Sequence, residues 1–274
     1  MADPVAVAVN GVMGRMGLQI ARLLSQNPLF RIVGGIERKG HSSIGVDIGL
    51  LIQGKNSGVM VTDDPASITA HVDCIIDFSI PASTMAILGY ARKKKISLVI
   101  GTTGISKEET EMIHQAGKET AIVQSPNMSV LVNLLFKLVE LAAGTIDDSF
   151  DAEIVEAHHK NKIDAPSGTA LKLADIIAHA RSKQLADVAR YERHGQIGTR
   201  PRGEIGIQTL RGGDIAGEHT VMFIGTGERL EITHRATSRE NFAQGALLAA
   251  QWIAGKKPGV YTMGDVLGFN QKQQ

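Results

Sequence analysis

Val5-Ala6-Val7-Ala8-Val9-Asn10-Gly11-Val12-Met13-Gly14-Arg15-Met16-Gly17 is the stretch that decides the fold of the first half of the chain. Its apolar start, residues 5–9, predicts a buried strand, and the apolar spacing of residues 16–25 predicts a helix. Between them the glycines follow a G-x-x-G-x-x-G register rather than the commoner G-x-G-x-x-G. Glycines in such a turn let backbone N–H groups approach a pyrophosphate, and the helix N-terminus favours its negative charge. A glycine-rich turn without a ligand is the alternative.

The same alternation of short apolar runs and helical patterns continues to residue 123. Strands that are apolar throughout and alternate with helices indicate a parallel sheet covered on both faces, as in doubly wound α/β proteins. The predicted strands are 30–36, 59–61, 73–78, 98–100 and 121–123, and the predicted helices are 81–94 and 107–117.

The pattern changes in the second half of the chain. Helical spacing over 130–143 is followed by a predicted strand, 150–157, and a helix, 170–180. Longer strands separated by glycine-rich turns then predict an antiparallel or mixed sheet, and so a second domain, at 205–210, 219–224 and 229–236. A last helix, 240–254, can rejoin the first domain.

Composition excludes several classes of protein. The chain has 274 residues, 29 Lys and Arg against 28 Asp and Glu, and a net charge of +1, without the basic surplus of a nucleic-acid-binding protein. Cys74 is the single cysteine and lies in an apolar run, which predicts a buried thiol and excludes an intrachain disulfide. No secretory signal or run of ~20 apolar residues occurs, so we expect a cytoplasmic protein without a membrane span.

An acidic residue and a basic residue follow the second predicted strand. Glu37 lies about twenty residues beyond the glycine loop, where a carboxylate binds the adenine ribose hydroxyls of a dinucleotide. Arg38 can meet a 2′-phosphate or remain a solvated charge, and Arg15 has the same two possibilities. Together these residues predict that both NADH and NADPH are accepted.

Short polar segments end three other predicted strands. Ligands of open α/β sheets bind beyond the carboxyl ends of the strands, so these segments are candidates for contact with the nicotinamide, or else ordinary turns. They are Phe78-Ser79, Gly101-Thr102-Thr103-Gly104 and Ser125-Pro126-Asn127-Met128.

Glu156-Ala157-His158-His159-Lys160-Asn161-Lys162-Ile163-Asp164-Ala165-Pro166-Ser167-Gly168-Thr169-Ala170 is the run that indicates chemistry. A substrate that gains a hydride also needs a proton, and histidine is the usual donor, so His158 or His159 is the candidate acid. No nearby spacing completes a metal site. Lys160 and Lys162 share a side if the chain stays extended, and either can bind a carboxylate. Ser167 is a good N-cap, and the N–H groups of Gly168 and Thr169 that follow it suit a second carboxylate.

These motifs closely resemble the 4-hydroxy-tetrahydrodipicolinate (dihydrodipicolinate) reductase family, pyridine-nucleotide enzymes of diaminopimelate and lysine synthesis. The 156–170 run is highly specific, whereas the glycine loop alone is not. The matching stretches are 11–17, 37–38, 77–79, 101–104, 125–129, 156–170, 211–215, 217–219 and 233–236.

The resemblance implies an N-terminal Rossmann-type domain, 1–127 and 238–274, and an α+β domain with a mixed open sheet, 128–237, that binds substrate and forms a homotetramer. It implies hydride transfer from NADH or NADPH to C4 of the ring of a small dicarboxylate and proton transfer from His158 to the adjacent carbon. Lys162 would serve substrate binding and catalysis. The implied carboxylate-binding residues are His159, Gly168 and Thr169, and the implied cofactor-binding residues are Gly11, Val12, Met13, Gly14, Arg15, Met16, Glu37, Arg38, Phe78, Gly101, Thr102, Thr103, Ser125, Asn127 and Met128.

One departure and two competing hypotheses accompany this resemblance. Some members carry Ala and Phe where this chain has Ser125 and Met128, which affects local packing and cofactor preference. An aspartate or homoserine dehydrogenase shares the glycine loop but gives no reason for the 156–170 run. A non-enzymatic nucleotide sensor would need an effector surface that no added domain supplies.

Overall fold

The computed structural model describes residues 3–270, which form two compact units. One unit runs to Val130 and resumes at Glu240, and the other is Leu131–Arg239. From the sequence we expect these divisions after residues 127 and 237.

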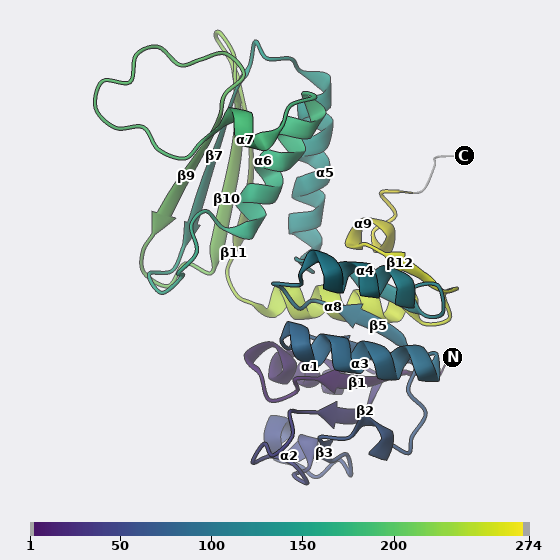
Figure 1. Ribbon diagram of the computed structural model, residues 1–274. Coiled ribbons are helices and arrows are strands. Elements are labelled where there is room, and N and C mark those ends of the chain that lie inside the picture. The colour runs from purple at the N-terminus through teal and green to yellow at the C-terminus, as the bar shows by residue number, and fades with distance from the viewer. Residues whose placement is uncertain (1–2, 271–274) are drawn as a thin grey trace. The chain divides into compact units, whose positions relative to one another are not determined.

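The first unit is built on a seven-stranded parallel sheet in the order β12-β6-β5-β4-β1-β2-β3 (Figure 1). The order in which the chain adds strands reverses at β1, since β2 pairs on one side of it and β4 on the other. Doubly wound folds bind their ligands at such a switch point. The strands are β1 (Val5–Asn10), β2 (Phe30–Ile36), β3 (Val61–Thr62), β4 (Cys74–Asp77), β5 (Ser97–Ile100), β6 (Ala121–Gln124) and β12 (Gly259–Tyr261).

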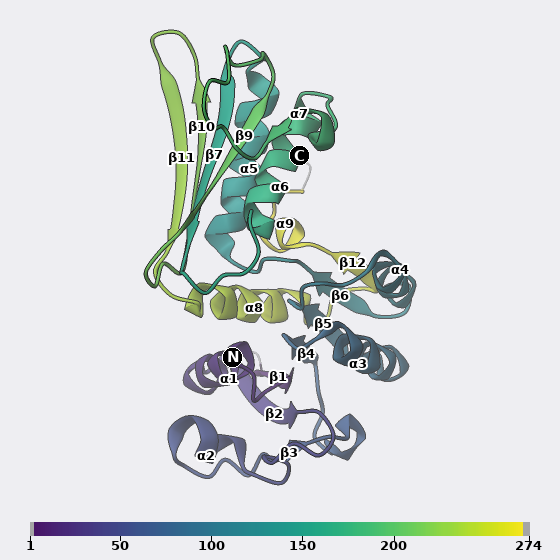
Figure 2. The same ribbon diagram turned by 60° about the vertical axis from the view of Figure 1, so that its left-hand side comes forward.

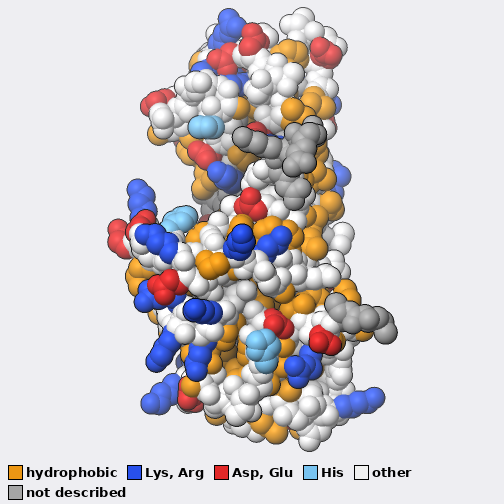
Figure 3. All heavy atoms as spheres, turned by 90° about the vertical axis from the view of Figure 1, so that its right-hand side faces the viewer, with side chains coloured by type: hydrophobic (Ala, Val, Ile, Leu, Met, Phe, Trp, Pro, Cys, Tyr) orange, Lys and Arg blue, Asp and Glu red, His pale blue; other side chains and the backbone are white. Residues whose placement is uncertain are grey.

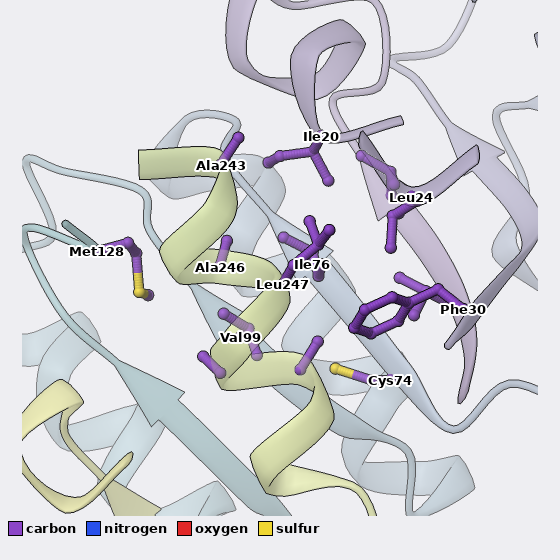
Figure 4. Packing of buried hydrophobic residues seen from close by; sticks show 14 of the residues in the cluster. Ile20, Leu24, Phe30, Cys74, Ile76, Val99, Met128, Ala243, Ala246 and Leu247 are labelled. Atoms are coloured by element: carbon purple, nitrogen blue, oxygen red, sulfur yellow. The ribbon is translucent and has the colours of Figure 1, made fainter. Parts of the chain in front are cut away.

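Helices cover both faces of this sheet, as the uniformly apolar strands predict (Figure 2). On one face Ile20 of α1 and Ala246 of α8 pack with Val99 and Ile76 of the strands, together with the buried thiol of Cys74 (Figure 4). On the other face Ile87 and Ile113 of α3 and α4 pack on the sheet. The bounds are α1 (Arg15–Gln26), α3 (Pro81–Lys94), α4 (Lys107–Ala116), α8 (Glu240–Ile253) and, after β12, α9 (Met263–Val266). The doubly wound prediction is confirmed.

A short helix, α2 (Ile48–Gln53), follows β2 and was not predicted, although both of its ends have sequence signals. Asp47 caps it by accepting from the N–H groups of Gly49 and Leu50, and Gly54 ends it with a φ of 68°. The Asp47 carboxylate also accepts from the backbone of Ser57 and Gly58, 2.9 and 2.6 Å away. Burial alone would raise the pKa of Asp47, but these hydrogen bonds outweigh it and lower the pKa to about 2.

We expect Asp47→Asn to destabilise the protein in a pH-dependent way. A carboxyl group whose pKa is lower in the folded than in the unfolded state stabilises the fold above about pH 4 and loses that contribution as the pH falls towards 2. The urea midpoint of the variant should therefore lie below that of the wild type at pH 7, with a gap that narrows as the pH falls to 2.5. A gap that is equal at both pH values would contradict this.

The second unit has a five-stranded sheet in the order β11-β10-β7-β9-β8. Strand β7 pairs antiparallel with β10 and parallel with β9, so the sheet is mixed, as predicted. Helices α5 and α6 lie against one face, and α7 follows α6 (Figure 2). The bounds are α5 (Val130–Thr145), β7 (Asp151–His158), α6 (Gly168–Ala180), α7 (Leu185–Val188), β8 (Ala189–Arg190), β9 (Ile205–Arg211), β10 (Gly217–Ile224) and β11 (Arg229–Ala236).

The surface carries both signs of charge. On the face drawn in Figure 3, acidic and basic side chains lie among exposed hydrophobic ones. None of the helices within residues 3–270 combines the length and the apolar character needed to cross a lipid bilayer.

Candidate active site

The glycine loop joins β1 to α1 by very close backbone packing. Gly11 has a φ of +70°, and a Cβ atom there would lie 3.0 Å from the Cβ of Ser79. A Cβ atom on Gly17 would lie 2.1 Å from the carbonyl oxygen of Gly11 and 2.7 Å from the Cα of Val12. The first turn of α1 therefore rests directly on the loop, which glycine alone permits.

The N-terminus of α1 presents backbone rather than side chains. Gly14 stands at the N-cap and makes no side-chain hydrogen bond, and the first N–H groups of a helix have no acceptor within it. Val12 is buried in the core, and Met13 and Met16 pack against it. The N–H groups of Gly11, Val12, Met13 and Gly14 are donated within the protein, so it is the first turn of α1 that can offer an anion its N–H groups, together with the exposed Arg15.

Glu37, immediately after β2, is hydrogen-bonded to the glycine loop. Its Oε2 accepts from the N–H of Met13 at 3.2 Å, and its Oε1 accepts from the N–H of Arg38 at 3.0 Å. The side chain of Arg38 is exposed. An acidic residue and a guanidinium therefore lie next to the loop that the sequence predicts to bind a pyrophosphate.

A buried carboxylate that the sequence analysis did not select, Asp77, joins the carboxyl ends of three strands. It accepts from Asn10 Nδ2 at the end of β1 (2.8 Å), from Ser79 Oγ after β4 (2.6 Å) and from Thr102 Oγ1 after β5 (3.1 Å). Thr84 of α3 donates to it at 2.5 Å. Asp77 thus fixes the relative positions of the segments at the carboxyl edge of the sheet.

The remaining cofactor candidates at this edge differ in exposure and in their contacts. Phe78 packs against Gly101, where a Cβ atom would lie 2.3 Å from the ring, and Thr103 is exposed. Ser125 Oγ donates to the carbonyl of Asn127 at 2.8 Å.

Met128 is buried beneath α8, and Gly245 faces its carbonyl oxygen so closely that a Cβ atom would lie 1.8 Å away. The side chain of Met128 is therefore part of the core (Figure 4). Only the main chain of Met128 can therefore face a ligand.

In the second unit, side chains of β7 alternate between the two faces of the sheet, and the face that is apolar at the start of the strand becomes polar at its end. Ala152 and Ile154 are fully buried in the core beneath the helices. Glu156 and His158 follow at the same spacing, so they share this face. The side chain of Glu156 is fully buried, and that of His158 is 12 % exposed.

Glu156 is the centre of a hydrogen-bond network. Arg211 of β9 binds both of its oxygens, each at 2.8 Å, and His158 Nδ1 lies 2.6 Å from Oε2. The backbone N–H of Ser167 donates to Oε1 at 2.9 Å. Burial alone would raise the pKa of Glu156, but the hydrogen bonds from Arg211, His158 and Ser167 outweigh it and lower the pKa.

His158 lies at the end of β7 with its Nδ1 held by Glu156. Burial lowers its pKa below the ordinary value, while Glu156 opposes this shift and Lys162 adds to it. His219 of β10 packs edge-on against it, with 5.3 Å between ring centres. Since Nδ1 is occupied, Nε2 is the nitrogen that can exchange a proton with a substrate.

The chain turns after His158 instead of staying extended. The N–H of Lys162 donates to the carbonyl of His159 at 3.1 Å, and Lys162 Nζ binds Asp164 at 2.8 Å. Lys160 and Lys162 therefore do not share a side by strand geometry, and Lys160 is exposed. The Nδ1 atom of His159 is buried and has no hydrogen-bond partner among residues 3–270.

The N-terminus of α6 completes this part of the site. Ser167 caps it by accepting from the N–H of Ala170 at 3.2 Å, and its Oγ lies 2.9 Å from His219 Nε2. Gly168 and Thr169 form the first turn, where N–H groups favour an anion. Burial, followed by the charge of His158, lowers the pKa of His219 to about 3.

Sequence reasoning did not select Arg211 or His219 as functional residues, and it left Glu156 without a role. One signal was available for Glu156, since it occupies a core position in the alternation that begins at Ala152. Arg211 and His219 lie on β9 and β10, which flank β7, and pairing between strands that are distant in sequence brings them to this site. No group of three or more His, Cys, Asp or Glu within residues 3–270 has a metal-binding arrangement.

Comparison with known proteins agrees with this arrangement of two units. The family model described as dihydrodipicolinate reductase, N-terminus, matches residues 5–128, and the one described as its C-terminus matches residues 131–267. A 4-hydroxy-tetrahydrodipicolinate reductase from Anaeromyxobacter dehalogenans (strain 2CP-1) is 50 % identical, with 96 % of this chain and 97 % of the relative covered. One from Syntrophobacter fumaroxidans is 47 % identical, with 97 % and 99 % covered.

A solved structure has the same fold. It is described as dipicolinate-bound dihydrodipicolinate reductase from Paenisporosarcina sp. TG-14 and aligns with a TM-score of 0.77, at 24 % identity, over 96 % of this chain and 99 % of that chain. Both family models and relatives of about half identical sequence cover almost all of the chain. The chain therefore belongs to the dihydrodipicolinate reductase family.

Proposed function

We propose that this protein reduces the ring derived from 4-hydroxy-tetrahydrodipicolinate to tetrahydrodipicolinate with NADH or NADPH, in diaminopimelate and lysine synthesis. The observation that carries the proposal is the cluster in the second unit. There Glu156 joins His158 to the N-terminus of α6, and Arg211 joins Glu156 to the carbonyl oxygen of Asp164, whose carboxylate binds Lys162. Relatives named for this activity share about half of the sequence. Neither an amino-acid dehydrogenase nor a nucleotide sensor accounts for this cluster.

The residues of the second unit have complementary tasks. His158 Nε2 gives a proton to the ring carbon next to the reduced one. Lys162 leaves its contact with Asp164 to neutralise a substrate carboxylate, and His159 binds the same anion. The N–H groups of Gly168 and Thr169 bind the second carboxylate. Two fixed anion sites orient the ring, which is a large part of catalysis by positioning.

The first unit fits a nicotinamide dinucleotide. The packing of Gly17 on Gly11 creates the close main-chain approach that a pyrophosphate requires, and no side chain caps α1. Glu37 would bind the ribose hydroxyls, and Arg38 would bind a 2′-phosphate. The segments at Phe78, Gly101–Thr103 and Ser125–Met128 would hold the nicotinamide, largely through main chain. The bound dihydronicotinamide supplies a hydride to C4 of the substrate ring.

Oxidation of NADH and NADPH tests this function directly. The substrate is made in the cuvette from pyruvate and aspartate semialdehyde by a synthase, and absorbance of the reduced nicotinamide is followed. Oxidation should depend on the synthase and occur with both cofactors. Measurable cofactor binding without synthase-dependent oxidation would contradict the substrate assignment.

Lys162→Ala should raise the KM of the substrate and the Kd of dipicolinate at least tenfold, because a buried or partly buried anion loses a charged hydrogen-bond donor worth about 1.5–3 kcal/mol. Lys160→Ala is the matched control, since this neighbouring lysine is exposed, and it should leave both constants within twofold. Calorimetric titration with dipicolinate gives the Kd. Equal effects of the two substitutions would contradict the role of Lys162.

Two further properties belong to the proposal. A homotetramer formed through the sheet of the second unit would cover side chains such as Leu210 and Leu230, which are 56 % and 49 % exposed in the single chain. A cytoplasmic location fits a free thiol at Cys74 and a biosynthetic reaction that uses reduced nicotinamide.

A further inference from the structure

Glu156 follows Ile154 on the buried face of β7, two residues further along the strand. Burial of a charged carboxylate at such a position costs much free energy. The neighbours of Glu156 across the sheet are Thr209 on β9 and His219 on β10. A buried carboxylate is retained in such a place only if its charge is paired and its oxygens are hydrogen-bonded. The hydrogen bonds of the Glu156 carboxylate therefore indicate its role in the site.

Arg211 supplies only some of the hydrogen bonds that the Glu156 carboxylate accepts. The guanidinium binds Oε1 and Oε2 as a fork and neutralises the charge, and Thr209 Oγ1 donates to Oε1 at 3.3 Å. Each oxygen has a further donor, which is the Ser167 N–H for Oε1 and His158 Nδ1 for Oε2. One carboxylate thus connects the proton donor to the first turn of α6.

We propose that Glu156 is a positioning residue that holds the His158 imidazole and the Ser167 turn together, so that the proton donor and the carboxylate-binding turn are aligned by one buried group. This inference rests on the proposed function, since it assigns how the two halves of that site are held.

The first consequence concerns the tautomer of His158. An ionised carboxylate only accepts hydrogen bonds, so Nδ1 must carry a hydrogen in both protonation states of the ring. The proton that the substrate receives then comes from Nε2. Without the carboxylate, the ring loses both its orientation and the partner that stabilises its charged form.

The second consequence concerns the N-terminus of α6. Ser167 is held at its N–H by Glu156 and at its Oγ by His219. With both groups fixed, the following N–H groups of Gly168 and Thr169 have a defined direction. Loss of Glu156 should therefore weaken binding of a dicarboxylate as well as proton transfer.

Glu153 of the same strand provides a matched control. It points to the opposite face of β7 and is bound by a fork from Arg193, with both N–O distances 2.8 Å, and by Arg200 at 3.0 Å. It makes none of the bonds described for the site. Glu153→Gln and Glu156→Gln remove the same charge from the same kind of pair, so stability losses common to both are separated from effects on the site.

The first experiment compares these two variants with the wild type. Glu156→Gln should move the His158-dependent limb of the pH–rate profile to lower pH by about one unit, because a charged hydrogen-bond partner is lost. It should weaken dipicolinate binding about tenfold and leave the Kd of NADPH within twofold. Glu153→Gln should leave the profile and both constants unchanged. Glu156→Asp keeps the charge, so it should restore most of the profile but not dipicolinate binding.

The structure identifies the charged and titratable groups around His158, so a shift in the pH–rate profile can be assigned to one of them. Arg211 lies on β9, Lys162 and Asp164 lie in the loop after β7, and His219 and His234 lie on β10 and β11. His219, with a pKa of about 3, stays neutral across the working range. The pKa of His234 is lowered by burial. His234→Gln should therefore leave the shifted limb in place, which assigns that limb to His158.

A second measurement needs no variant at position 156. Nitrogen NMR of the wild type, with the signal of His158 assigned by its loss in His158→Gln, should show the neutral ring protonated at Nδ1. A neutral ring protonated at Nε2 would overturn the proposal even if Glu156→Gln does not fold. So would a Glu156→Gln profile and dipicolinate affinity equal to those of the wild type. If the wild type fails to reduce the substrate, the proposed function fails, while the tautomer still decides the role of Glu156.

Discussion

His158→Gln is expected to lower kcat by about 10²- to 10⁴-fold, the usual contribution of a general acid. The substitution removes the one nitrogen that faces away from Glu156 and can carry a proton to the substrate, without changing the fork between Glu156 and Arg211. His158 belongs to the second unit and the glycine loop to the first, so the Kd of NADPH should stay within twofold. Stopped-flow kinetics and fluorescence titration with NADPH measure the two quantities.

The pH dependence supplies a second check of the same residue. Burial, opposed by Glu156, lowers the pKa of His158, and the acid must be protonated to act. The kcat/KM of the wild type should therefore fall as the pH rises through a pKa below the ordinary histidine value of about 6.5. This limb should be absent in His158→Gln. His179→Gln, at an exposed position in the last turn of α6, is the control and should keep both the rate and the limb. A turnover of His158→Gln equal to that of the control would exclude the acid role.

Local signals were sufficient for most of the fold. The apolar strands and helical spacings predicted the long elements, such as α3 and β2, at the bounds that the structure has. The elements that were missed are short. The strand β12 has three residues and is stabilised by pairing with β6, a contact between distant parts of the chain that no local pattern reveals.

The candidate site divides in the same way. His158, Lys162 and Ser167 lie in one run, so their chemistry was visible from spacing and from the resemblance. Arg211 and His219 reach Glu156 and Ser167 through the order β10-β7-β9 of a sheet whose strand order could not be derived. Asp77 is similar, because its partners at Asn10 and Thr102 come together only when β1, β4 and β5 are neighbours. Positioning residues are defined by tertiary neighbours, whereas groups that face a ligand can be recognised in short motifs.

Gly17→Ala is expected to weaken binding of NADH and NADPH at least tenfold while the second unit keeps its affinity for dipicolinate. The new methyl group would lie 2.1 Å from the Gly11 carbonyl oxygen and 2.7 Å from the Val12 Cα, both backbone atoms that cannot rotate away. The loop must therefore move off α1, and the N–H groups that approach a pyrophosphate move with it. Tenfold corresponds to about 1.4 kcal/mol, which is within the range of about 1–3 kcal/mol that overpacking costs.

Gly89→Ala is the matched control for this substitution. Gly89 is also in a helix, α3, but a Cβ atom there would meet nothing within 4 Å. Alanine should stabilise that helix by about 0.5–1 kcal/mol and leave cofactor binding unchanged. Thermal unfolding and NADPH fluorescence on both variants separate a general effect of alanine from a local effect on the loop. If folded Gly17→Ala binds NADPH as Gly89→Ala does, the glycine loop is not the pyrophosphate site, and the charge of the cofactor must be met elsewhere on the first unit.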